Sequence, residues 1–95
     1  AKVAAKYNGL YATHMRDGGD SVTFAIEEAL TIGREAYIPV EISHFKLSGQ
    51  HNWGRSKITV PMIEKARKEG IEVTIDQYPY TASSTSISTL IPDEI

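Results

Sequence analysis

Strand-like and helix-like segments alternate along this chain, and this alternation limits its fold more than any other feature. Short apolar runs typical of buried strands occur at about residues 9–14, 40–45 and 71–78. Helical spacing of apolar residues covers residues 21–37, and a second helix is expected from about residues 59–61 to Gly70. The order predicts parallel strands joined by helical crossovers. We therefore predict an α/β fold with about three parallel strands alternating with helices.

The expected helix boundaries rest on capping residues and prolines. Asp20 or Ser21 is expected to cap the first long helix, because short polar side chains bind the free amides of a helix start. Pro39 ends that helix, because proline cannot extend it. Pro61 predicts the first turn of the second helix, where proline is tolerated, and Gly70 predicts its end.

Composition narrows the class of protein. The 95 residues carry a net charge of −2, which is too small to predict a nucleic-acid partner. No apolar run approaches the length needed to span a bilayer, and no secretory signal is visible, so we expect a cytoplasmic protein without a membrane partner. The absence of cysteine excludes disulfides and thiolate ligands within the chain.

Both ends of the sequence suggest a segment of something larger. The opening "AKVAAKYNG" has no methionine and resembles the tail of a helix closed by Asn8-Gly9. The chain stops at "IPDEI" before another element can be identified. We expect an internal piece of a longer protein.

Two histidines occupy matching positions 30 residues apart, His14 in "YATHMRD" and His44 in "EISHFK". Each lies at the expected C-terminal end of a strand, the edge where parallel α/β folds collect their ligands. Neighbouring strands are about 4.8 Å apart, so the two imidazoles can meet one metal ion such as zinc. The alternative is that each is a hydrogen-bonded structural histidine. Two ligands do not complete a zinc site, so further ligands would lie outside this chain.

The stretches "GLYATHMRD", "ISHFK", "NWG" and "DQYPYTASST" resemble the N-acyl-D-amino-acid deacylases, or D-aminoacylases, of the amidohydrolase superfamily. The resemblance runs from about residue 7 to residue 90. It implies a metal-dependent (β/α)8 barrel of TIM type, of which residues 1–95 would be a part with about three strands. It also implies that His14 and His44 bind zinc or another divalent metal, and that Lys46 contacts the substrate carboxylate.

The same resemblance places Tyr78 and Ser84 in the pocket for an N-acyl-D-amino acid, whose hydrolysis yields a carboxylate and a D-amino acid. The family's His-x-His pair, its bridging cysteine or equivalent ligand and its water-activating aspartate have no counterpart here. A carboxylate base is needed to take a proton from the attacking water. We therefore expect no catalytic residue within this chain, an incomplete metal site, and no useful activity from the 95 residues alone.

Two other functions remain open at this point. One is a cyclic amidohydrolase of the hydantoinase or dihydroorotase kind, which would share the superfamily but not the substrate. The other is a non-catalytic binding module that kept the same βα units. An isolated three-stranded piece would also leave sheet edges and an apolar face uncovered, so we expect it to self-associate or to be only partly ordered.

Several other polar residues have structural explanations. Arg16 is as well explained by a loop ion pair as by ligand binding, and His51 is expected to be solvent-exposed. Trp53 either packs its loop against the barrel rim or lines the pocket, and packing is the expectation, because large aromatics mostly bury area. Asp76 should find a hydrogen-bond partner. If His44 points into the barrel, strict alternation puts Val40 and Ile42 on the same inner side and turns Glu41 toward the helices, where its carboxylate has no evident purpose.

Overall fold

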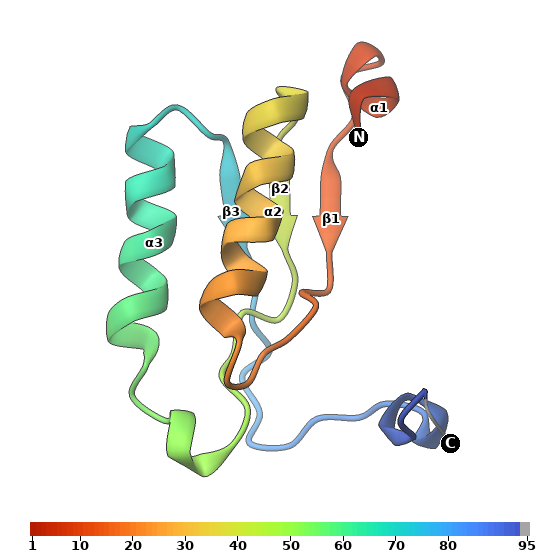
Figure 1. Cartoon of the computed structure of the whole chain (residues 1–95), viewed down its shortest axis with the longest axis vertical. Coiled ribbons are helices and arrows are strands. Elements are labelled where there is room, and N and C mark those ends of the chain that lie inside the picture. The colour runs from red at the N-terminus through yellow and green to blue at the C-terminus, as the bar shows by residue number, and fades with distance from the viewer. Residues whose placement is uncertain (94–95) are drawn as a thin grey trace.

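The computed structural model describes residues 1–93 and consists of one small sheet with helices (Figure 1). In chain order the helices and strands are α1 (Lys2–Lys6), β1 (Tyr11–Thr13), α2 (Val22–Ala36), β2 (Val40–Ile42), α3 (Ser56–Lys68) and β3 (Val73–Ile75). Two 3-10 turns, η1 (Gln50–Asn52) and η2 (Ile87–Leu90), lie in the loops after β2 and β3.

The three strands form a parallel sheet in the order β1-β2-β3. Tyr11 pairs with Val40, and Val40 pairs with Val73, so equivalent positions of the three strands lie in one row. All three strands therefore end at the same edge of the sheet (Figure 1). The predicted α/β fold with alternating helices and parallel strands is confirmed.

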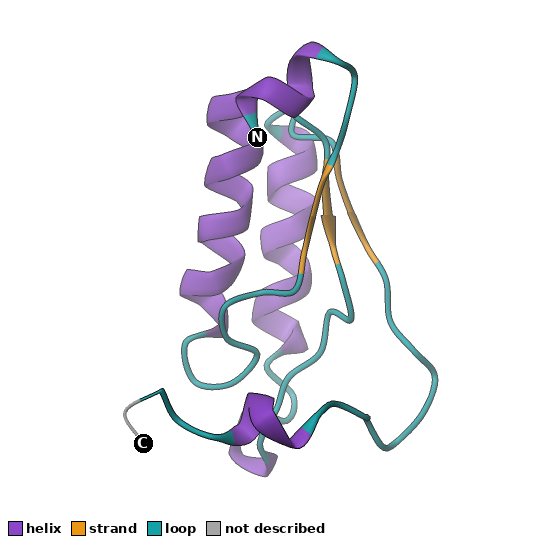
Figure 2. Cartoon of the chain, turned by 90° about the vertical axis from the view of Figure 1, so that its right-hand side faces the viewer, coloured by secondary structure: helices purple, strands orange, loops and turns teal. Residues whose placement is uncertain are grey.

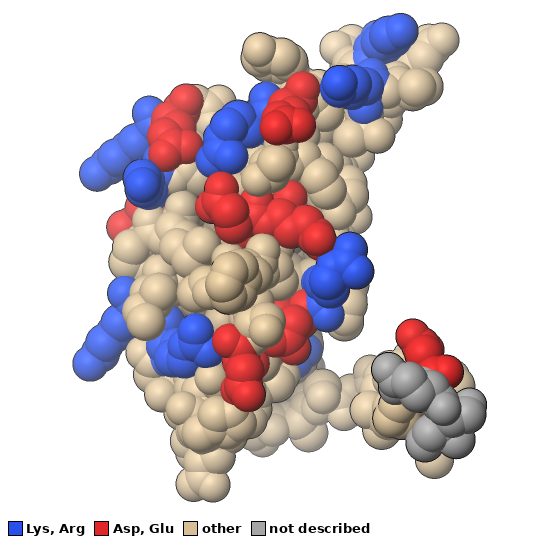
Figure 3. All heavy atoms as spheres, in the orientation of Figure 1, with Lys and Arg blue, Asp and Glu red and all other residues tan. Residues whose placement is uncertain are grey.

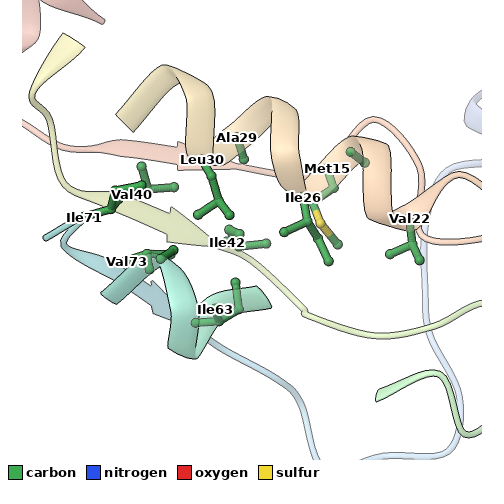
Figure 4. Close-up of a cluster of buried hydrophobic side chains, with 12 residues drawn as sticks. Met15, Val22, Ile26, Ala29, Leu30, Val40, Ile42, Ile63, Ile71 and Val73 are labelled. Carbon is green, nitrogen blue, oxygen red and sulfur yellow. The ribbon is translucent and has the colours of Figure 1, made fainter. Parts of the chain in front are cut away.

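The long helices α2 and α3 cover one face of the sheet, and within residues 1–93 no helix lies over the opposite face (Figure 2). The core lies between these two layers, where apolar side chains of the helices meet those of β2 and β3 (Figure 4). Its most deeply buried large residues are Ile26, Ile42, Val22, Val40 and Val73. Burial of such side chains contributes about 1.5–3 kcal/mol each relative to leaving them in water.

The helix boundaries show where local signals succeed and where they fail. α2 begins and ends within one residue of the expected 21–37, and Tyr37 closes it in a left-handed conformation. α3 begins at Ser56, nearly one turn before the expected start, and carries Pro61 inside it. Pro61 lies in the second turn, so the helix lacks one amide hydrogen bond there but remains helical. Gly70 follows the end of α3 with φ of 97°, as expected.

Cations and anions are mixed over the outer surface of the helices (Figure 3). Arg34, for example, lies 3.3 Å from carboxylate oxygens of both Glu27 and Glu69. Within residues 1–93, no helix has both the length and the apolar character that crossing a membrane requires.

The uncovered face of the sheet carries Ala12, Glu41 and Thr74 in one row, paired across the three strands. The Thr74 hydroxyl donates a hydrogen bond to the Glu41 carboxylate on this face. Val40 and Ile42 instead lie buried beneath the helices. The expectation that Glu41 faces the helices was therefore wrong. β2 ends at Ile42 and a turn follows, so the direction of the His44 side chain does not predict that of the residues before it.

Candidate functional site

His14 and His44 meet at the C-terminal edge of the sheet. His14 follows β1 directly, and His44 lies two residues beyond the end of β2. Nδ1 of His14 is 2.7 Å from Nε2 of His44, and the ring centres are 4.6 Å apart with the planes at 71°. At this distance one ring donates a hydrogen bond and the other accepts it. The pair thus presents two imidazole nitrogens to one point in space.

The backbone of His44 has an unusual conformation, and its amide binds a residue beyond the neighbouring strand. Its φ is 38°, in the left-handed region that few residues other than glycine adopt. The His44 amide donates a 2.7 Å hydrogen bond to Oδ1 of Asp76, which directly follows β3. This donor is the largest cause that lowers the pKa of the Asp76 carboxyl. The expectation that Asp76 finds a hydrogen-bond partner is confirmed.

An open hollow of about 840 Å³ surrounds the histidine pair. The segment after β3 runs past the C-terminal ends of the strands (Figure 2). Residues of this segment line the other side of the hollow. The hollow is lined by all five residues that the resemblance assigned to the site: His14, His44, Lys46, Tyr78 and Ser84. The Lys46 ammonium lies 5.1 Å from the centre of the Tyr78 ring, within the range of a cation–π contact.

The two imidazole nitrogens of the histidine pair can supply two of the four ligands of a tetrahedral zinc ion. Two nitrogens bound to one tetrahedral zinc at 2.0–2.1 Å are about 3.3 Å apart. The observed 2.7 Å is shorter, so a metal ion would replace the hydrogen bond after the rings separate by roughly 0.6 Å. Across residues 1–93, no group of three or more His, Cys, Asp or Glu side chains is arranged to hold a metal ion. The described residues alone therefore offer two ligands and not a closed site.

The loop that follows Lys46 is tied to the loop before α2 by a polar cluster. Nδ2 of the buried Asn52 donates hydrogen bonds of 2.9 Å to Oδ1 of Asp20 and to the Ser48 carbonyl. The His51 ring lies 2.5 Å from the same Asp20 oxygen, and Arg55 donates to the Asn52 side-chain oxygen at 2.8 Å. The hydrogen bond from the Asn52 amide is the largest cause that lowers the pKa of the Asp20 carboxyl, and the hydrogen bond with His51 is the second largest. Sequence patterns missed Asn52, because a polar residue in a glycine-rich loop gives no periodic signal.

This cluster changes two expectations about nearby residues. Neither Asp20 nor Ser21 caps α2 as expected. Ser21 lies at the start of α2, but its side chain makes no capping hydrogen bond, and the Asp20 side chain binds Asn52 and His51. The Asp17 carboxylate instead accepts the Ser21 amide at 2.6 Å. Trp53 was expected to pack, but 71% of it is exposed. His51 is exposed as expected, although it binds Asp20.

The Arg16 side chain binds Glu28 and not the histidine pair. It makes a 3.1 Å ion pair with Glu28 on α2, and 77% of its side chain is exposed. An exposed pair of this kind contributes about 0–1 kcal/mol to stability. The loop ion-pair interpretation of Arg16 is therefore confirmed.

Sequence comparison identifies relatives that are named as D-aminoacylase or N-acyl-D-glutamate deacylase. The chain is 51% identical over 81 residues to a D-aminoacylase of Alcaligenes xylosoxydans xylosoxydans, covering 85% of this chain. It is 41% identical over 93 residues to an N-acyl-D-glutamate deacylase of the same organism, covering 98% of this chain. No family model matches the chain.

Comparison of structures leads to the same proteins. A crystal structure of a D-aminoacylase, described as defining a novel subset of amidohydrolases, superposes with a TM-score of 0.79 at 47% identity over 83% of this chain. The N-acyl-D-glutamate deacylase of Bordetella bronchiseptica, solved with zinc and a phosphonate mimic of the tetrahedral intermediate, superposes with a TM-score of 0.80 at 44% identity over 84% of this chain.

The extent of these matches is uneven. They cover most of this chain but only 16–18% of the two curated relatives, and 16–17% of the two solved chains. The sequence identity of 41–51% extends over 78 residues or more, and the matched segment of the solved structures has the same fold as this chain. The resemblance predicted from the motifs is therefore confirmed: over most of its length, this chain matches one segment of the N-acyl-D-amino-acid deacylases.

Proposed function

We propose that this chain forms part of the active site of a metal-dependent hydrolase that converts N-acyl-D-amino acids to a carboxylate and a D-amino acid. The observation that carries the proposal is the 2.7 Å approach of His14 Nδ1 to His44 Nε2. These nitrogens open onto a hollow that also contains Lys46, Tyr78 and Ser84. A metal-binding pair, a cation and two hydroxyls in one place suit an amide substrate that carries a free carboxylate.

We propose that residues 1–95 belong to a (β/α)8 barrel. The helices cover a single face of the parallel sheet, which is the arrangement of a barrel wall. The opposite face, with Glu41 and Thr74, would then line the barrel interior. The candidate site lies at the C-terminal ends of the strands, where barrel enzymes place their active sites.

His14 and His44 would hold zinc or another divalent metal, with further ligands and the water-activating aspartate supplied from outside this chain. A bound zinc ion lowers the pKa of its water and polarises the substrate carbonyl. The ammonium of Lys46 would bind the substrate carboxylate through a charge-assisted hydrogen bond. The hydroxyls of Tyr78 and Ser84 would donate to the same carboxylate or to the developing oxyanion. The 95 residues by themselves would be inactive.

Metal analysis and substrate assays on the full-length gene product test this proposal. We expect bound zinc, turnover of N-acetyl-D-amino acids over their L-isomers, and loss of both metal and activity in His14→Ala and His44→Ala. His51→Ala is the matched control, because His51 is bound to Asp20 outside the histidine pair and should leave both unchanged. Turnover of hydantoin without turnover of acyl amino acids would instead indicate a cyclic amidohydrolase. Absence of both metal and hydrolase activity would indicate a binding module.

We further propose that the isolated 95-residue chain self-associates. β1 and β3 are both edge strands, and no helix of the described part of the chain lies over one face of the sheet. Uncovered edges offer unpaired amides and carbonyls to another chain. A compact cooperative monomer in sedimentation and unfolding experiments would contradict this proposal.

A further inference from the structure

Asp76, which follows β3, makes three hydrogen bonds to the end of β2 and to the turn that carries His44. The Asp76 amide donates to the Ile42 carbonyl at 3.2 Å, and the Asp76 carbonyl accepts the Phe45 amide at 2.8 Å. The first bond continues the parallel pairing of β2 with β3. In the second, the Phe45 amide takes the place at the Asp76 carbonyl that regular pairing would give to the His44 amide. The third bond differs, because the side-chain Oδ1 of Asp76 accepts the His44 amide at 2.7 Å. The carboxylate thus binds the residue at which regular pairing stops.

That residue needs an external support. His44 has φ of 38°. This left-handed conformation is sterically unfavourable for any residue with a Cβ atom unless the surroundings hold it there. A return to negative φ would change the direction of the Cα–Cβ bond and with it the position of the imidazole. The observed conformation is the one that brings His44 Nε2 within 2.7 Å of His14 Nδ1. Among residues 1–93, the Asp76 carboxylate is the acceptor for the His44 amide.

We propose that Asp76 is a positioning residue for the histidine pair: its carboxylate holds the His44 backbone in the left-handed conformation that aims the imidazole at His14. The consequence for metal binding rests on the proposed function, whereas the effect on the backbone does not. Asp76 acts through the amide of His44 and is itself not placed among the metal ligands.

Two variants separate the hydrogen bond from the general loss of a side chain. Asp76→Ala removes the acceptor, whereas Asp76→Asn keeps an oxygen that can accept the same amide without the charge. Glu72→Ala is the matched control, because Glu72 is an exposed carboxylate directly before the same strand, at the opposite edge of the sheet. Unfolding midpoints of the full-length variants show whether each one is folded.

The first readout uses the metal-free, full-length protein. Hydrogen–deuterium exchange of a peptide spanning residues 43–46 should become at least about tenfold faster in Asp76→Ala, with a smaller change in Asp76→Asn and none in Glu72→Ala. The second readout is zinc affinity by competition with a chromophoric chelator. The dissociation constant should rise about 10–100-fold in Asp76→Ala, the usual effect of removing a group that orients a ligand, and largely recover in Asp76→Asn.

Each outcome decides the inference. Unchanged exchange at His44 in Asp76→Ala overturns it, whether or not the protein binds zinc. Faster exchange with unchanged zinc affinity overturns it as well, because the carboxylate would then support the backbone without positioning the ligand. If His44→Ala binds zinc as well as the wild type does, the proposed function fails, and the exchange experiment still decides what Asp76 does to the backbone.

Discussion

The ammonium of Lys46 lies over the ring of Tyr78, 5.1 Å from its centre, at the edge of the hollow that contains the histidine pair. The two residues come from loops after different strands, so the contact joins the β2 end to the segment after β3. The tyrosine ring restricts the lysine side chain without neutralising its charge. The contact therefore restrains Lys46 at the place where, under the proposed function, a substrate carboxylate would bind.

Removal of this charge should weaken binding of the substrate carboxylate. Lys46→Ala in the full-length protein should raise KM for an N-acetyl-D-amino acid about 10–100-fold, which corresponds to the loss of one hydrogen bond between charged groups. The same change should leave KM for the corresponding carboxamide, which has no carboxylate, nearly unchanged. Lys57→Ala, on the exposed side of α3, is the control. An equal rise of KM for both substrates would show that Lys46 does not contact the carboxylate.

Alanine at Gly33 should destabilise the fold, although alanine is normally the better helix residue. A Cβ at position 33 would lie 2.5 Å from Cγ2 of Val40 and 3.3 Å from Cγ2 of Ile71. Helix propensity favours alanine by about 1 kcal/mol. Overpacking of a core costs about 1–3 kcal/mol, and the backbone of β2 is fixed by the sheet. We expect a net loss of up to about 2 kcal/mol in the free energy of unfolding, measured with urea.

The same experiment contains its own controls. Gly18→Ala should change stability by less than about 0.5 kcal/mol, because its nearest neighbours would be 3.5 Å and 3.6 Å away. Gly33→Ala should also cost less in a Val40→Ala background, because the clashing methyl group is gone. Equal costs in both backgrounds would contradict the steric explanation.

Glycine at position 37 should stabilise the end of α2. Tyr37 has φ of 51° and is 91% exposed, so it has the left-handed conformation without much packing in return. The left-handed conformation costs an ordinary residue about 1–2 kcal/mol, and glycine avoids this cost. Glycine also has more conformational freedom in the unfolded chain, which reduces the gain by about 0.5–1 kcal/mol. We expect Tyr37→Gly to raise the free energy of unfolding by about 0.5–1 kcal/mol. Tyr37→Ala keeps the backbone cost and should give no such gain.

The link between Asp20 and Asn52 should make stability depend on pH in the acid range. The folded-state pKa of Asp20 lies below its ordinary value of 3.8, chiefly because the Asn52 amide donates to the carboxylate. The stabilising contribution is therefore present above pH 3.8 and is lost as the pH falls through the folded-state pKa. Asp20→Asn should be less stable than the wild type at about pH 6, and the difference should shrink at about pH 2.5.

The control for this pH dependence is Glu64→Gln. Glu64 is an exposed carboxylate on α3. Its replacement should leave the pH dependence of unfolding as in the wild type. A stability difference between Asp20→Asn and the wild type that is constant from about pH 6 to pH 2.5 would show that the ionised Asp20 carboxylate does not stabilise the fold.

Local sequence determined the elements of this protein whose causes are local. The apolar spacing of residues 22–36 and the proline at position 39 were enough to place α2 within one residue. Alternation of helices and strands was enough to predict the parallel sheet, because short loops and crossover helices leave few other arrangements. The strand ends also put His14 and His44 at one edge, since parallel strands end together.

The tertiary structure decided what depends on contacts between distant residues. The direction of Glu41 could not be predicted from His44, because a turn separates the two residues, and the amide of His44 binds Asp76, 32 residues away. The buried Asn52 binds Asp20, again 32 residues away, whereas Trp53 beside it is exposed. Periodicity reports which face of a regular element is apolar. Where the backbone leaves regular geometry, as it does after Ile42, side-chain direction is set by partners that the local sequence does not contain.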